Sequence, residues 1–147
     1  MAKSEDDHIK VYVDLSHVDC PVGGESLWAK KSGKGKAEIC NIPFFAANIS
    51  LGDIVKIKKD KEHGYLVTEV LEKVTHKIML KYKKGKTEKG TRKKFAKLGE
   101  YLNERGIKVE GMVPGFAMAC FDKSLHKERV EAIIEAAPHL LKWAEDE

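Results

Sequence analysis

The sequence predicts an α+β protein, with a small five-stranded bent sheet or barrel packed on a ferredoxin-like half. Three observations predict this fold. Short runs of alternating apolar and polar residues, separated by Gly, Pro and Asp turns, fill the first half of the chain. The second half alternates strand-like runs with stretches of helical period. Residues 72–75 contain neither Gly nor Pro, so we expect modules at 1–73 and 74–147 that pack rigidly into one compact unit.

Five runs in the first module have the two-residue period of half-buried strands. In the first run, Ile9, Val11 and Val13 alternate with polar neighbours. The expected strands cover 9–15, 26–30, 36–42, 54–59 and 65–71. A Gly-Lys-Gly turn at 33–35 joins the second and third into a hairpin. Five short strands with tight turns favour a small barrel or a strongly bent sheet.

The second module predicts the order β-α-β-β-α, which is the first five elements of a ferredoxin-like fold. Its expected elements are a strand at 77–83, a helix at 91–105, strands at 107–111 and 116–121, and a helix from about Ser124. No sixth strand is apparent. The edge that it would occupy is therefore either open or filled by the first module.

Helix-end signals set the expected limits of the two helices. Thr91 is placed to cap the first helix, and Gly106 is placed to end it. Pro138 is expected to break or kink the second helix, with Leu140, Leu141 and Trp143 on a further short turn.

Composition excludes several classes of protein. Of the 147 residues, 42% are hydrophobic and 34% are charged, which argues against long disorder. No apolar run approaches the ~18 residues of a membrane span, and the acidic N-terminus lacks the apolar core of a secretion signal. Three cysteines without framework spacing suit a reduced compartment. We expect a cytoplasmic protein with no membrane association.

Positive charge is concentrated between Lys73 and Lys97. This window holds eleven Lys or Arg residues and one acid, Glu88, so its net charge is +10 in a chain of +4. Such a surface suits phosphate groups or an acidic protein partner. The plainer interpretation is that these side chains only solvate a strand, a loop and a helix start. The lysines that we expect to bind a partner are Lys77, Lys81, Lys83, Lys84 and Lys86.

Motifs for catalysis or metal binding are scarce. The tripeptide GKT at 85–87 imitates the end of a P-loop, but Leu80 occupies the position of the required earlier glycine. His17 and Cys20 are close in sequence, but a zinc site needs further paired ligands. The loop that holds them also lacks an elbow that activates a nucleophile. We expect no enzyme, catalytic residue, metal or cofactor, and leave open a convergent site near His17, Cys20 and Glu25.

Phe44 and Phe45 follow Pro43 in an apolar elbow and are the aromatic candidates for binding. An exposed aromatic pair beside a basic track suits single-stranded nucleic acid. Apolar neighbours at 42–47 favour the other interpretation, in which the pair plugs the open end of the barrel.

Taken together, five segments resemble a bacterial family of small stand-alone proteins known as domain of unknown function 4265. The segments are VGGESLWA at 22–29, NIPFFA at 41–46, SLGDIV at 50–55, YLVTEV at 65–70 and VEGMVPGF at 109–116. The resemblance spans roughly residues 9–121, although family members tend to be acidic where this chain is rich in lysine. The family has no assigned activity. The resemblance implies key positions for Glu25, Asn41 and Asp53, which either line a cleft beside the elbow or satisfy backbone groups at turns.

We expect a non-catalytic binding protein that acts through a protein–protein interface, of the immunity kind that neutralises a toxin domain. Small size, an open sheet edge and concentrated charge support this hypothesis. The alternative is binding of RNA or single-stranded DNA through the 73–97 basic face, with Phe44 or Phe45 stacking on bases. The missing sixth strand also suits edge-to-edge dimerisation.

Overall fold

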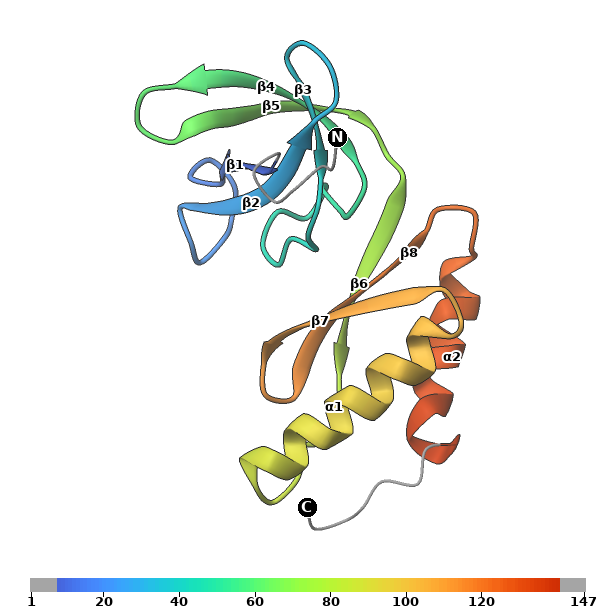
Figure 1. Ribbon diagram of the computed structural model, residues 1–147. Helices are drawn as coiled ribbons and strands as arrows, with labels where there is room; N and C mark the ends of the chain where they lie inside the picture. The colour runs from blue at the N-terminus through green and yellow to red at the C-terminus, as the bar shows by residue number, and fades with distance from the viewer. Residues whose placement is uncertain (1–7, 141–147) are drawn as a thin grey trace, which may run out of the picture. The chain divides into compact units, whose positions relative to one another are not determined.

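The computed structural model describes residues 8–140, and in this range the chain forms eight strands and two helices (Figure 1). The chain divides into two compact units, with the boundary between Thr75 and His76. Each unit has its own hydrophobic core. Neither helix is long and apolar enough to cross a membrane. The acidic start of the chain and the turn expected at Leu141 and Trp143 lie outside the described residues.

Five strands of the first unit close into a barrel in the order β1-β2-β3-β4-β5. They are β1 (His8–Asp14), β2 (Gly24–Lys31), β3 (Lys36–Ile39), β4 (Ile54–Asp60) and β5 (Gly64–Glu72). Consecutive strands pair antiparallel, and a parallel bridge between Tyr12 and Leu66 joins β1 to β5. The predicted five-stranded bent sheet is confirmed.

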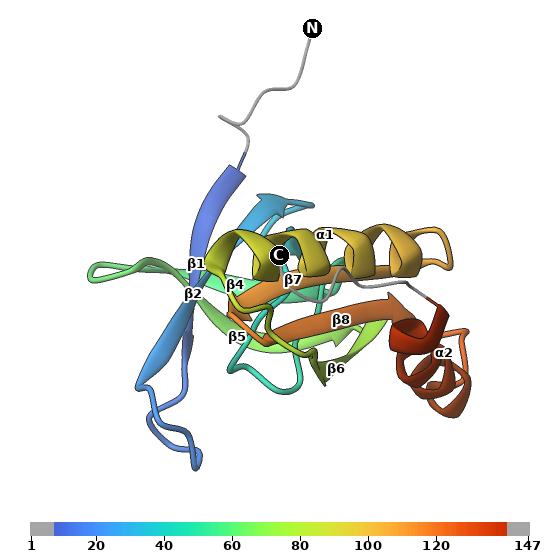
Figure 2. The ribbon, with the colours of Figure 1, turned by 90° about the horizontal axis from the view of Figure 1, so that it is seen from below.

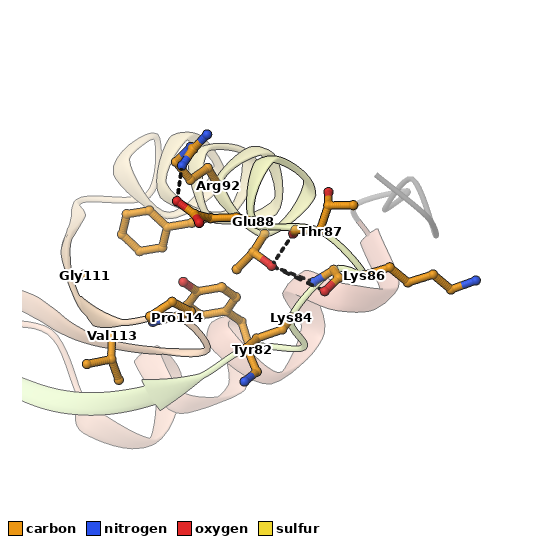
Figure 3. Close-up of a pocket in the computed structure, with 12 residues that line it drawn as sticks. Tyr82, Lys84, Lys86, Thr87, Glu88, Arg92, Gly111, Val113 and Pro114 are labelled. Carbon is orange, nitrogen blue, oxygen red and sulfur yellow. Dashed lines mark hydrogen bonds and ion pairs between the residues drawn. The ribbon is translucent and has the colours of Figure 1, made fainter.

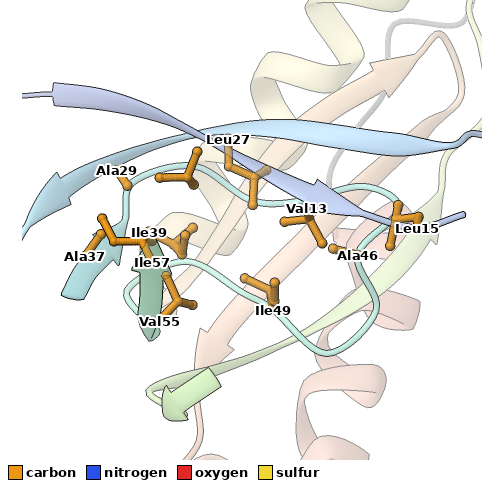
Figure 4. Packing of buried hydrophobic residues seen from close by; sticks show 11 residues of the cluster. Val13, Leu15, Leu27, Ala29, Ala37, Ile39, Ala46, Ile49, Val55 and Ile57 are labelled. Carbon is orange, nitrogen blue, oxygen red and sulfur yellow. The ribbon is translucent and has the colours of Figure 1, made fainter. Parts of the chain in front are cut away.

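The barrel core follows from the alternation that predicts the strands, because every second residue of a strand points to the same side. Val11 and Val13 of β1 and Leu27 and Ala29 of β2 are buried. Figure 4 shows how the core side chains converge from several strands. Ala46 and Ile49, from the segment between β3 and β4, are members of the same core.

Strand β3 ends at Ile39, three residues before the predicted limit. Cys40 still donates its backbone N–H to the Trp28 carbonyl, at 2.8 Å. The side chain of Asn41 then accepts the Trp28 N–H at 2.7 Å, in place of a backbone carbonyl. Pro43, which has no N–H and disfavours some conformations of the residue before it, follows two residues later.

The second unit contains a three-stranded sheet in the order β6-β8-β7. Its elements are β6 (Thr75–Lys81), α1 (Glu88–Asn103), β7 (Ile107–Val113), β8 (Phe116–Asp122) and α2 (Lys127–Leu140). This is the predicted β-α-β-β-α half of a ferredoxin-like fold. In the described part of the chain, β6 is an edge strand of this sheet. In a complete ferredoxin-like fold, a fourth strand pairs with that edge.

Contacts between β6 and β8 show that the two strands are antiparallel. The Tyr82 N–H, just after β6, donates to the carbonyl of Gly115, just before β8, at 2.9 Å. At the opposite ends, the rings of His76 and Phe121 lie 6.2 Å apart. One face of the sheet packs on the helices, with Leu80, Phe121 and Leu98 of α1 in the same core. Figure 2 shows α1 lying along this sheet beside β7.

Helix α1 begins a full turn earlier than predicted, and its cap is Thr87 rather than Thr91. Thr87 has extended backbone angles, and its side chain accepts the Gly90 N–H at 2.9 Å. The Thr91 hydroxyl instead donates to the Thr87 carbonyl at 2.9 Å and accepts the Gly85 N–H at 3.0 Å. Both threonines suit a cap by residue type, so tertiary contacts decided between them. Gly106, at φ +80°, follows the end of the helix as predicted.

Helix α2 begins at Lys127, three residues after the predicted start. Asp122 forms a turn first, because its side chain accepts the Ser124 N–H at 2.8 Å and its carbonyl accepts the Leu125 N–H at 3.0 Å. The helix then continues through Pro138 to Leu140. Of the two predicted effects of Pro138, a break or a kink, the break does not occur. Pro138 has no N–H to bond the carbonyl four residues earlier, and only two residues of α2 follow it, so the loss is confined to the end of the helix.

Candidate functional site

The five predicted lysines lie on two parts of the second unit. Lys77 and Lys81 alternate along β6 with Ile78 and Leu80, which belong to the helix-facing core. Lys77 and Lys81 are therefore on the other face of the sheet, and Lys83 follows just beyond the strand end. The other two, Lys84 and Lys86, line a cavity at the start of α1.

Three large apolar side chains are exposed in the same region as Lys81. Met79, Val113 and Phe116 are 53%, 58% and 37% exposed. Val113 pairs with Phe116 across the 113–116 turn. The Lys81 ammonium lies 5.8 Å from the centre of the Phe116 ring, a cation–π contact. We call this set, together with the exposed Lys83, the lysine–apolar patch: Met79, Lys81, Lys83, Val113 and Phe116.

The local charge is smaller than the sequence count indicates. Lys73 pairs with the fully buried Asp53, with 2.6 Å between Nζ and Oδ2. Lys94 is only 6% exposed. Arg92 pairs with Glu88 at 2.7 Å, but the sequence count already includes this acid. The basic window is therefore partly neutralised and partly buried, and the counting of residues could not detect either effect.

A cavity of about 780 Å³ lies at the start of α1. Its lining residues are Tyr82, Lys84, Gly85, Lys86, Thr87, Glu88, Thr91, Arg92, Phe95, Gly111, Val113 and Pro114. Figure 3 shows the ring of Tyr82 between the helix and the turn that carries Pro114. The rings of Tyr82 and Phe95 lie 5.5 Å apart. This cavity combines aromatic walls with basic side chains, and neither composition nor a local motif predicts it.

A second cavity, of about 640 Å³, lies in the first unit and brings two predicted features together. The loop with His17 and Cys20 and the elbow with Phe44 and Phe45 all line it. Phe45 is 38% exposed, whereas Phe44 is half-buried. Three acids, Asp14, Asp19 and Glu69, share this lining, and none of the described lining residues is Lys or Arg. The phenylalanines are thus beside acidic groups here, not beside a basic track.

Glu25 does not line this cavity, but its side chain fixes the backbone of the elbow. Its carboxylate accepts the backbone N–H groups of Phe44, Phe45 and Ala46 at 2.8, 3.0 and 2.9 Å. Three hydrogen bonds to one carboxylate fix the local backbone strongly. Both oxygens are therefore occupied with a structural task.

Asp53 and Asn41 have similar tasks. Asp53 accepts the N–H groups of Ser50 at 2.9 Å and Val74 at 2.8 Å, in addition to the Lys73 ammonium. Asn41 accepts the Trp28 N–H. Of the two interpretations of Glu25, Asn41 and Asp53, the structure supports the one in which they satisfy backbone groups at turns.

Metal-ligand side chains do not cluster in the part of the chain that the structure describes. No group of three His, Cys, Asp or Glu residues in residues 8–140 is arranged to hold a metal ion. All three cysteines are free thiols, and burial raises the pKa of Cys40 above its ordinary value.

The two units define an α+β protein in which a closed five-stranded barrel precedes a ferredoxin-like half. The chain belongs to the family described as Domain of unknown function (DUF4265), whose model matches residues 25–136. This confirms the resemblance found in the sequence. A crystal structure of a hypothetical protein from Neisseria gonorrhoeae has a similar fold, with a TM-score of 0.62 and 18% identity. The similarity covers 89% of this chain and 87% of that one. None of the curated proteins matches this chain.

Proposed function

We propose that this protein is a non-catalytic binding protein that recognises an acidic protein partner through the lysine–apolar patch. The exposure of Met79, Val113 and Phe116 next to Lys81 and Lys83 is the observation that supports the proposal. Protein interfaces typically combine an apolar, aromatic centre with a charged rim. Within this class, we propose an immunity or inhibitor protein whose partner is a toxin domain.

Charge complementarity defines the partner. Lys81 and Lys83 attract an acidic surface over a range of about 10 Å at 0.1 M salt and thereby raise the association rate. Phe116 and Val113 supply apolar area, and Met79 adapts its shape to different surfaces. A partner segment with an apolar side chain between acidic ones meets both requirements.

The experiment is an affinity capture from the lysate of the native host, with and without nuclease. The test variant is the Lys81→Glu, Lys83→Glu double substitution. The matched control reverses Lys34 and Lys61, which are exposed turn residues of the first unit. We expect a stoichiometric protein partner that survives nuclease, is retained by the control and is lost with the double variant. Retention of that partner by the double variant at low salt contradicts the proposal.

A second candidate function is binding of single-stranded RNA. One RNA-binding module uses aromatic side chains on the surface of a four-stranded sheet, where bases stack. Phe116 with Lys81 is an exposed pair at the start of β8, on the sheet face away from the helices, where Met118 and Cys120 farther along the strand are buried. It replaces Phe44 and Phe45, whose surroundings are acidic, as the stacking candidate.

Salt dependence separates the two candidates. If RNA binds through about six phosphate contacts, its affinity falls roughly 10³-fold between 50 and 200 mM salt. The measurement is fluorescence anisotropy with a labelled 12-nucleotide RNA, on the wild type and on Phe116→Ala. A steep salt response that depends on Phe116 favours RNA. Absence of binding at 50 mM salt excludes it.

A further inference from the structure

We propose that the cavity at the start of α1 binds a small aromatic carboxylate. This site is distinct from the proposed protein interface, because Tyr82, Phe95, Gly111 and Pro114 form it and are not in the lysine–apolar patch. Val113 is shared between the two. The proposal makes the second unit a small-molecule receptor as well as a docking surface.

The size and walls of the cavity suit a flat apolar body. Its volume of about 780 Å³ lies within the range of roughly 300–1,000 Å³ found for small-molecule sites. Tyr82 and Phe95 supply two rings, tilted by 35° to each other. A bound aromatic ring packs against such rings in offset or edge-to-face geometry.

Gly111 keeps the cavity open. A Cβ atom at Gly111 meets the ring of Phe95 at 3.5 Å, which is ordinary van der Waals contact. Alanine is therefore tolerated there, whereas the branched side chain of valine extends further into the space beside Phe95. The backbone of Gly111 is not in the left-handed region, so neither substitution strains the backbone angle φ.

Basic side chains make an anionic group the better ligand. The lining contains Lys84, Lys86 and Arg92 against one acid, Glu88, which Arg92 binds. Lys86 extends away from Tyr82 and Pro114 in Figure 3, and Arg92 is paired with Glu88, so we assign the carboxylate to Lys84. Lys84 also lies along the 113–115 turn, since a Cβ atom added to Gly115 would lie 3.3 Å from the Cγ atom of Lys84. The start of α1 adds a partial positive charge to the same rim.

Hydrogen bonds hold the cavity in shape without a ligand. The Thr91 hydroxyl accepts the Gly85 N–H at 3.0 Å and donates to the Thr87 carbonyl at 2.9 Å. Thr87 in turn binds the Gly90 N–H. These bonds fix the 85–87 loop against the helix, so binding does not require the loop to be ordered first. Preorganisation of this kind increases affinity.

The test uses 2-naphthoate as the probe and the ¹H–¹⁵N spectrum of the full chain as the readout. We expect shifts of the amide signals at 84–92 and 111–115. We expect a dissociation constant below about 1 mM, because the corresponding free energy of binding is one that so small a ligand can reach. The uncharged analogue 2-naphthylmethanol and inorganic phosphate are each expected to bind at least about tenfold more weakly, because each lacks one of the two recognised features.

Three variants locate the site. Gly111→Val is expected to weaken naphthoate binding at least about tenfold by filling space, and Gly111→Ala less. Lys84→Gln is expected to weaken it about threefold to tenfold, whereas Lys34→Gln in the first unit leaves it unchanged. Thermal unfolding of each variant checks its fold, and Gly111→Ala serves if Gly111→Val does not fold.

Several outcomes overturn the proposal. These are no shifts at 5 mM naphthoate, shifts confined to the barrel cavity, equal affinity for 2-naphthylmethanol or phosphate, or unchanged affinity in the folded Gly111 variant. The Phe116→Ala variant removes a patch side chain without changing the charge beside Lys84, and it is expected to bind naphthoate like the wild type. The two proposals can therefore fail independently.

Discussion

The Lys73 ammonium lies 2.6 Å from the carboxylate of Asp53, and the Asp53 side chain is fully buried in the first unit. The same carboxylate accepts backbone N–H groups from Ser50 and Val74. Lys73 also donates to the carbonyl of Asn48 at 3.3 Å. One buried acid therefore ties the 48–53 turn to the chain that follows β5, and it withdraws Lys73 from the basic surface.

Substitution of Asp53 is expected to destabilise the first unit strongly. Asp53→Ala leaves a half-buried ammonium and buried N–H groups without an acceptor, which costs about 3–5 kcal/mol. The measurement is urea unfolding followed by circular dichroism. Glu62→Ala, in an exposed turn, is the matched control and is expected to change stability by less than about 0.5 kcal/mol. An Asp53→Ala protein as stable as this control refutes the role of the carboxylate.

Glu25 is expected to determine the shape of the 44–46 elbow. Glu25→Ala removes the acceptor for three N–H groups, at an expected cost of about 2–4 kcal/mol. Glu25→Gln keeps one acceptor oxygen and is expected to lose about half as much. Amide chemical shifts of Phe44, Phe45 and Ala46 report the change directly. If these shifts stay the same in Glu25→Ala, the three hydrogen bonds do not hold the elbow.

The position of the α1 cap is testable with hydroxyl variants. Thr87→Ala is expected to cost about 1 kcal/mol, because the Gly90 N–H loses its acceptor. Thr87→Ser keeps the hydroxyl and is expected to be close to the wild type. Hydrogen exchange at the first turn of α1 measures the effect. Faster exchange in the serine variant as well as the alanine variant argues for loss of methyl packing instead.

Asp14 provides a pH-dependent prediction. The Ser16 hydroxyl and the Ser16 N–H both donate to the Asp14 carboxylate, at 2.6 and 2.9 Å, and these bonds lower the pKa of Asp14. A depressed folded-state pKa stabilises the protein at neutral pH, and this contribution is lost as the pH falls through the folded pKa. Ser16→Ala is expected to raise the Asp14 pKa toward its ordinary value.

Carboxyl NMR titration measures this change, with an internal control. Asp122 has a pKa lowered by hydrogen bonds from Ser124 in the same way, so it should keep its value in the Ser16→Ala protein. An unchanged Asp14 pKa assigns the depression to a cause other than Ser16.

The sequence is sufficient to predict the order and the type of the secondary-structure elements. Alternating patterns in the first half predict five strands, and all five occur, because burial of one face of a strand has a clear signature of period two. The largest errors concern element ends: Thr91 looked like a cap but binds Gly85 and Thr87 instead. Threonine suits both tasks by type alone, and only the three-dimensional position of Gly85 distinguishes them.

Residue types also limited what the sequence could say about sites. Lys73 and Lys81 are both lysines of the basic window and cannot be distinguished by residue type. In the structure, Lys73 pairs with a buried acid, whereas Lys81 lies over the Phe116 ring. The cavity between Tyr82, Phe95 and Gly111 has a lining that runs from Tyr82 to Pro114, 32 positions apart, so no local motif could reveal it.

The sequence by itself determined the α+β class and the two sets of elements, because these depend on local periodicity and on turn residues. Five short segments carried the resemblance to the family. The tertiary structure decided which charges are exposed, which polar side chains hold the backbone and where cavities lie. These properties depend on contacts between residues distant in sequence, such as Glu25 with Phe44 and Asp53 with Lys73. Periodicity shows which face of an element is buried, but only the folded chain shows what that face meets.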